Sequence, residues 1–295
     1  MLTGLLLCIG TGLLWTLIGI LFTRISKSQD HPLTYMASAL FFTALWAWLF
    51  TANWYTLGSG SIPALEAFLP IIILAGALNS AYSIFMLYAM RRGHNAVTWT
   101  IGQSAMVVPF LASLVFWHDR VIWNGSLGVG IIFFSILILG FGRSREEKSG
   151  RDYVWLVLAI CTFLCVGISQ TLFTIPSRWQ GWTDAASLRI PVSTLAGFLL
   201  QAGILLRLRK FPGRQALLTG FFQSIISIVG QRMLFAGMDI LGSYGMVSVV
   251  YPLSVGVCIV GVSLYSLLIM KERFKITEVS GIAAGLAGII LISWH

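Results

Sequence analysis

Ten stretches of mostly apolar residues, each close in length to the thickness of a lipid bilayer, run through this chain. A helix needs roughly 20 apolar residues to cross the hydrocarbon core. Lipid offers no partners to backbone amides, so spanning segments of this kind must be helices that satisfy their own hydrogen bonds. Only 10% of the residues are charged, against roughly 25% in soluble domains. The sequence therefore predicts an all-α integral membrane protein with ten transmembrane helices.

The predicted spans are separated by short polar connections, so we expect no soluble domain between them. The spans cover 2–22, 33–51, 67–90, 95–116, 124–142, 153–173, 184–206, 215–238, 242–269 and 276–294. The first span lacks the basic start and the cleavage site of a signal peptide, so we interpret it as a membrane helix. The polar segment 143–152 is predicted to be a cytoplasmic linker between two five-helix halves, 1–142 and 153–295.

Basic residues are distributed unevenly between the two sides of the predicted membrane. Fifteen of the 19 Lys and Arg residues follow odd-numbered spans, whereas Arg120, Arg178 and Arg189 lie on the opposite side and Arg232 lies inside a span. Positive loops face the cytoplasm. We therefore expect a cytoplasmic (inner) membrane protein with both termini outside. The membrane also explains the net charge of +9 without a nucleic-acid partner.

The sequence lacks the motifs of several kinds of enzyme and metal site. The four Cys residues form no zinc pattern, and the chain has neither a P-loop nor a hydrolase or metalloprotease motif. The acidic residues fall at predicted span ends or in connections, whereas proton pumps and cation exporters need a carboxylate deep in the membrane. The sequence thus predicts no enzyme, no metal and no cofactor, and it leaves the coupling ion open between proton and sodium.

The two halves of the chain repeat one another weakly. The segment LYAMRRGHNAVTW in the first half corresponds to LFAGMDILGSYGM in the second, and the acid–Arg pair Asp119–Arg120 corresponds to Glu272–Arg273. Five spans per half is an odd number, so the second half must enter the membrane from the opposite side. Such inverted five-helix repeats recur in secondary transporters, which bind solutes near the midplane between the halves.

Two five-helix halves, each ending in a helix, an acidic turn and a Gly-rich helix, resemble the drug/metabolite transporter superfamily, including its EamA-like members. The sequence KER at 271–273 is the best single match. The stretch LPIIILAGALNSAYSIFMLYAMRRG, residues 69–93, is similar to the third span of the sugar-transporting branch, the rhamnose–proton symporters and bacterial glucose-uptake proteins. Span four lacks a Pro at the position equivalent to Pro252, since Pro109 lies deeper. No sugar site is therefore carried over residue by residue.

Polar and aromatic residues inside the spans form the candidate solute-binding set, because polar groups in lipid are costly and face the bundle interior. The set is Trp15, Asn79, Tyr82, Trp99, Gln103, Gln170, Gln223, Arg232 and Tyr251. Trp99 and Gln103 share one helix face, as do Asn79 and Tyr82, which places an aromatic ring beside an amide. The alternative for each residue is a hydrogen bond between helices or an anchor at the interface.

Two of these positions carry further expectations. Arg232 either extends to the outer interface or supplies a fixed positive charge for an anionic solute, with Asp239 as a candidate partner. Tyr251 precedes Pro252, which removes a backbone donor, so we expect a kink there. Broken helices of this kind line the sites of transporters.

These features together predict a secondary active transporter that moves a small polar solute, preferably a sugar or related neutral metabolite, by alternating access. An alternative with the same fold is an exporter of amino acids or other metabolites. A second alternative is a membrane-embedded enzyme or an assembly protein. The expected partners are the solute, the lipid bilayer and a coupling ion, and the chain acts as a monomer or a homodimer.

Overall fold

The computed structural model describes residues 1–26, 31–54, 65–92, 95–118, 123–144, 153–178, 185–268 and 276–293. Within these ranges all regular structure is helical, and no described residue belongs to a strand. The expected all-α class is therefore confirmed for this part of the chain. The linker residues 145–152 and the two C-terminal residues fall outside the described ranges.

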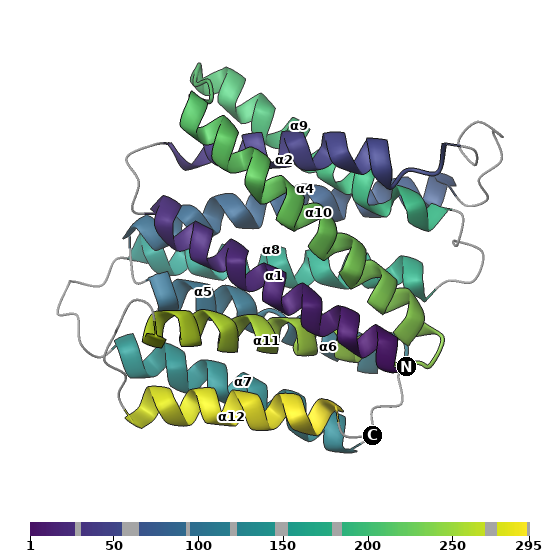
Figure 1. Cartoon of the computed structure of the whole chain (residues 1–295), viewed down its shortest axis with the longest axis vertical. Coiled ribbons are helices and arrows are strands. Elements are labelled where there is room, and N and C mark those ends of the chain that lie inside the picture. The colour runs from purple at the N-terminus through teal and green to yellow at the C-terminus, as the bar shows by residue number, and fades with distance from the viewer. Residues whose placement is uncertain are drawn as a thin grey trace.

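The helices of the first half follow the predicted spans closely, with one exception described below. They are α1 (Leu2–Ser26), α2 (Pro32–Phe50), α4 (Leu65–Arg92), α5 (Asn95–Ser104), α6 (Val107–Phe116) and α7 (Trp123–Ser144). The second half contains α8 (Tyr153–Thr174), η1 (Ile175–Ser177), η2 (Ala185–Leu188), α9 (Arg189–Leu208), α10 (Arg214–Gly242), α11 (Val247–Leu268) and α12 (Ile276–Ser293). Most helices run in similar directions across a stack, and α1 and α10 cross it obliquely (Figure 1).

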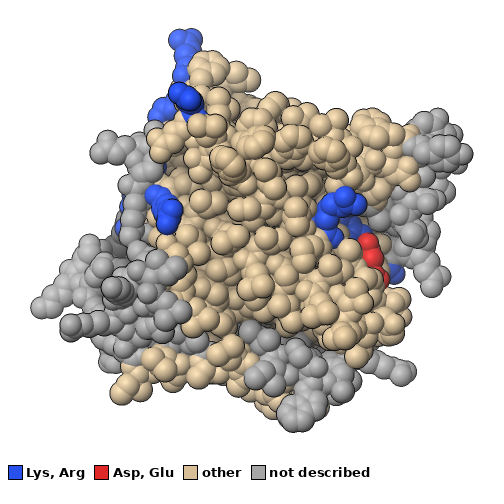
Figure 2. Space-filling model, in the orientation of Figure 1, with Lys and Arg blue, Asp and Glu red and all other residues tan. Residues whose placement is uncertain are grey.

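Six described helices are long and apolar enough to cross a membrane, namely α1, α2, α4, α8 together with η1, α9 and α10. Shorter apolar helical segments cover 101–116, 247–262 and 279–288. Large apolar side chains such as Leu6, Phe134 and Leu199 point outward, as expected of surfaces that face lipid. Figure 2 shows a broad uncharged face with Lys and Arg near two opposite margins. The chain is therefore a multi-pass helical membrane protein.

Most helix packing joins the first half of the chain to the second. α1 packs against α10 and α11, and α2 packs against α9 and α10. α8 packs against α4, α5 and α6, and α9 packs against α4. These pairings match when the halves exchange roles, since α1–α10 corresponds to α8–α4 and α2–α10 corresponds to α9–α4. α7 and α12 pair with each other at one end of the stack (Figure 1).

Glycines permit two of these crossings. A Cβ atom on Gly76 of α4 would clash with the backbone of Ser193 on α9, and one on Gly220 of α10 would lie 2.8 Å from the backbone nitrogen of Ala39 on α2. Small residues allow membrane helices to approach closely, which strengthens their dispersion contacts. The α4–α9 and α10–α2 crossings thus rely on the same device in the two halves.

The predicted continuous span over 95–116 is wrong, because two helices occupy it. α5 ends at Ser104 and α6 begins at Val107, and the Val108 amide donates to the Ala105 carbonyl at 2.9 Å instead of to a residue four back. Pro109 lacks an N–H, and its ring opposes the carbonyl four residues earlier, that of Ala105. α11, by contrast, runs without interruption through Pro252. The broken helix is therefore in the first half, not at Pro252.

Candidate functional site

A cavity lies between the two halves of the chain. Its walls come from α1, α2, α4 and α5 on one side and from α8, α9, α10 and α11 on the other. No Lys, Arg, Asp or Glu is among the described residues that line it. Its volume is about 150 Å³, comparable with cavities that hold a single six-membered ring. The described lining of the cavity is therefore uncharged.

Eight of the nine candidate residues line this one cavity. They are Trp15, Asn79, Tyr82, Trp99, Gln103, Gln170, Gln223 and Tyr251. Sequence spacing predicted only that neighbours on one helix share a face. The structure brings together residues from six helices, α1, α4, α5, α8, α10 and α11.

Arg232 is the exception, since it does not line the cavity. Its side chain is exposed, and Nη1 lies 3.4 Å from the Phe50 carbonyl, to which it donates. This placement fits the alternative in which Arg232 extends to the interface. Asp239 is not its partner, because the carboxylate pairs with Arg189 instead.

Aromatic rings give the cavity a flat wall. The rings of Trp15 and Tyr251 stack with centroids 6.5 Å apart and planes 21° apart. Trp99 meets Phe22 edge to face at 5.8 Å. Rings in such offset arrangements present an extended apolar surface. A solute with one apolar face could lie against this wall while its polar groups reach the amides.

The polar groups of the cavity are only partly satisfied by the protein. The Tyr35 hydroxyl donates to Oε1 of Gln223, which leaves the Gln223 amide hydrogens for other acceptors. Nε1 of Trp99 and Oε1 of Gln170 are buried and have no hydrogen-bond partner within the described part of the chain. A buried polar group without a partner costs about 1–3 kcal/mol. One donor and one acceptor on cavity-lining residues are thus buried and unpaired within the described part of the chain.

Hydroxyl side chains complete the lining and were missed by sequence reasoning. Thr43 of α2 and Ser193 and Thr194 of α9 also face the cavity. The hydroxyls of Thr43 and Thr194 donate to carbonyls of their own helices, of Ala39 and Ile190, both at 2.7 Å. Ser and Thr commonly bond in this way in membrane helices, so their presence in a span carries little signal for a site.

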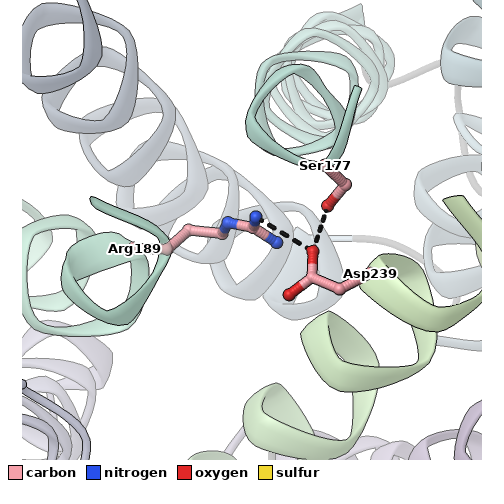
Figure 3. A network of polar contacts seen from close by, with 3 residues as sticks. All are labelled: Ser177, Arg189 and Asp239. Atoms are coloured by element: carbon pink, nitrogen blue, oxygen red, sulfur yellow. Dashed lines mark hydrogen bonds and ion pairs between the residues drawn. The ribbon is translucent and has the colours of Figure 1, made fainter. Parts of the chain in front are cut away.

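Arg189, Asp239 and Ser177 form a polar network around one ion pair (Figure 3). Nη2 of Arg189 donates to Oδ1 of Asp239 at 3.2 Å, and the Ser177 hydroxyl donates to the same oxygen at 2.6 Å. The Arg189 side chain is 1% exposed, whereas that of Asp239 is 47% exposed. The guanidinium carbon of Arg189 lies 4.7 Å from the centre of the Phe235 ring, and Phe235 lines the cavity.

The predicted span 184–206 contains Arg189, and the structure places this residue at the start of a helix. Arg189 is the first residue of α9, directly after η2, and its side chain is buried. Pro191 is the sequence signal that could have placed the helix start here, since Pro is favoured in the first turn of a helix and disfavoured further in. The partner Asp239 lies 50 residues away, at the end of α10.

Basic connections that follow odd-numbered spans meet at one end of the bundle. The charges of Lys210 and Arg91 act on His31, and Nη2 of Arg24 donates to the Tyr265 hydroxyl at 3.3 Å. Burial, reinforced by those two positive charges, lowers the pKa of His31 from its ordinary 6.5. Basic residues at the end of α4 and just after α9 thus lie near His31, and Arg24 of α1 contacts α11.

Comparison with known proteins gives a fold likeness and no family. We find no match among protein-family models and none among curated proteins. A solved crystal structure, described only as that of a protein, superposes with a TM-score of 0.73 over 99% of this chain and 98% of the other, at 14% sequence identity. At that identity the likeness shows that the two chains share a fold.

Proposed function

We propose that this chain is a secondary active transporter that moves a small polar solute across the cytoplasmic membrane by alternating access. One observation carries the proposal: apolar, membrane-length helices enclose an uncharged cavity between two halves, and the cavity presents amides, hydroxyls and stacked aromatic rings. Cavities of this composition bind small molecules, with the few polar groups providing orientation and specificity. The preferred solute is a sugar or related neutral metabolite.

The proposed topology has ten spans in two inverted halves, with α5 and α6 forming one broken span. Two features support it. Helix pairings match when the halves are exchanged, and Gly76 and Gly220 serve equivalent crossings. The basic connections gathered near His31 and Arg24 lie at one end of the bundle, which the positive-inside rule assigns to the cytoplasm. Both termini then face outward.

The neutral character of the solute follows from the lining. A charged solute in a membrane-buried cavity needs a compensating charge, and the lining contains none. A hydroxyl-bearing ring meets the cavity's needs, because each hydroxyl can accept from Nε1 of Trp99 or donate to Oε1 of Gln170. Its apolar face would pack on Trp15 and Tyr251. The two halves would then rock around the bound solute to expose it to either side.

Solute flux in proteoliposomes tests the proposal. Purified chain would be reconstituted, and uptake of labelled neutral monosaccharides would be compared with that of sugar acids and amino acids of similar size. We expect neutral solutes to move, Gln103→Ala to weaken their uptake, and Arg232→Gln to behave as wild type because Arg232 lies outside the cavity. The proposal would be contradicted if the purified protein moved none of these solutes. It would also be contradicted if Arg232→Gln lost uptake while Gln103→Ala kept wild-type uptake.

A further inference from the structure

Three elements of the second half each place one residue on the cavity wall and a polar residue four positions before or after it in the chain. Phe173 precedes Ser177, Ser193 follows Arg189, and Phe235 precedes Asp239, and the first-named residue of each pair lines the cavity. Four residues correspond to about one helical turn. Ser177, Arg189 and Asp239 therefore form a second layer directly beyond the wall.

The residues of the cavity wall contact one another, the residues of the second layer contact one another, and one contact joins the wall to the second layer. In the first, the rings of Phe173 and Phe235 touch with centroids 5.5 Å apart. In the second, Oδ1 of Asp239 accepts from both Arg189 and Ser177, as Figure 3 shows. The guanidinium of Arg189 stacks over Phe235 and joins the layers. An aromatic pair backed by a hydrogen-bonded ion pair thus lies at this end of the cavity.

This end of the bundle is the one at which the chain begins. A Cβ on Gly4 of α1 would lie 2.9 Å from the side chain of Leu241, two residues after Asp239. The start of α1 and the end of α12 lie on this side in Figure 1. We propose that Phe173, Phe235, Ser177, Arg189 and Asp239 form an outer barrier, closed in this structure, which opens when the start of α9 separates from the end of α10. The proposal rests on the proposed transport function.

The two partners of the ion pair differ in solvent exposure, and this difference predicts which substitution opens the barrier more. Arg189 is almost fully buried, and its Nε and Nη1 have no partner in the described part of the chain, whereas Asp239 is half exposed. Removal of the Asp239 charge strands a buried guanidinium, which regains water only when the barrier opens. Removal of the Arg189 charge leaves a carboxylate that water already reaches. Asp239→Asn should therefore favour the open form more than Arg189→Met does.

Cysteine accessibility measures the barrier without any solute. A Cys placed at Thr194, on the cavity wall of α9, would be labelled in intact cells with a membrane-impermeant maleimide, relative to the chain with its native cysteines only. We expect Asp239→Asn to raise the labelling rate about fivefold or more, the lower end of typical coupling effects. Arg189→Met should raise it less, and Asp239→Glu should restore the slow rate. Arg232→Gln is the matched control, since it removes a charge from the same helix outside the barrier and should change nothing.

Thermal melts would establish that each variant folds. If Asp239→Asn does not fold, Ser177→Ala would take its place, and we expect a smaller increase in labelling rate from it. Equal labelling in Asp239→Asn and Arg232→Gln would overturn the proposal, as would a larger rise in Arg189→Met than in Asp239→Asn. A rise seen only in inverted membrane vesicles would place the barrier on the inner side and overturn its assignment. Labelling needs no solute, so the two assays can fail separately. If labelling changes as expected but no solute moves in the flux assay, the transport proposal is refuted and the proposed barrier still stands.

Discussion

Substitution of Gly76 by Ala tests the helix crossing that sets the width of the cavity. An added Cβ would lie 2.6 Å from the Cα of Ser193, where real Cβ atoms essentially never come within 3.0 Å of another atom. Carbon atoms pack best at about 3.5–4.0 Å, so α4 and α9 would have to separate by about 1 Å. Overpacking of this kind costs about 1–3 kcal/mol. The neighbour is backbone, so no side-chain rotation can relieve the contact.

Gly203→Ala is the matched control, because a Cβ there would meet nothing within 4 Å. Both substitutions gain the same helix propensity, up to about 1 kcal/mol, so the difference between the two variants isolates the steric cost. At about 2–4 °C per kcal/mol for chains of this size, Gly76→Ala should melt roughly 2–12 °C below Gly203→Ala. Tryptophan fluorescence of the purified protein in detergent would record the melts. Coincident melting curves would refute the close approach of α4 and α9.

Further predictions concern the cavity, His31 and the topology. Gln103→Ala should weaken solute binding by about 0.5–1.5 kcal/mol. Trp99→Ala should weaken it more, because the aromatic wall is also lost. If equilibrium binding shows wild-type affinity in both variants, the site is contradicted. His31 should titrate below 6.5 in nuclear magnetic resonance, and Lys210→Gln should move its pKa upward. Since its folded-state pKa is lowered, stability from neutral His31 is present above pH 6.5 and is lost as pH falls through the lowered value. A Cys at position 295 should react with an impermeant reagent in intact cells, and reaction only after permeabilisation would reverse the topology.

The helices and their positions could be predicted from the sequence, because the length and apolarity of a span are local properties. The predicted span 2–22 is α1, Leu2–Ser26, and 33–51 is α2, Pro32–Phe50. A bilayer imposes the same length on every span and demands that each satisfy its own backbone, so no knowledge of neighbouring helices is needed. The candidate residues followed from the same reasoning, since polar groups inside such spans avoid lipid.

Only the tertiary structure decided where a helix breaks and which charge is buried. Pro109 and Pro252 look alike in the sequence, yet the break lies before Pro109 and α11 is continuous. Arg232 and Arg189 carry the same charge, yet Arg232 reaches the surface while Arg189 is enclosed beside Asp239. The cost of burying a charge depends on what surrounds it, and the partner of Arg189 comes from a helix end 50 residues away. Such contacts form only when the helices pack together, so a local sequence pattern does not predict them.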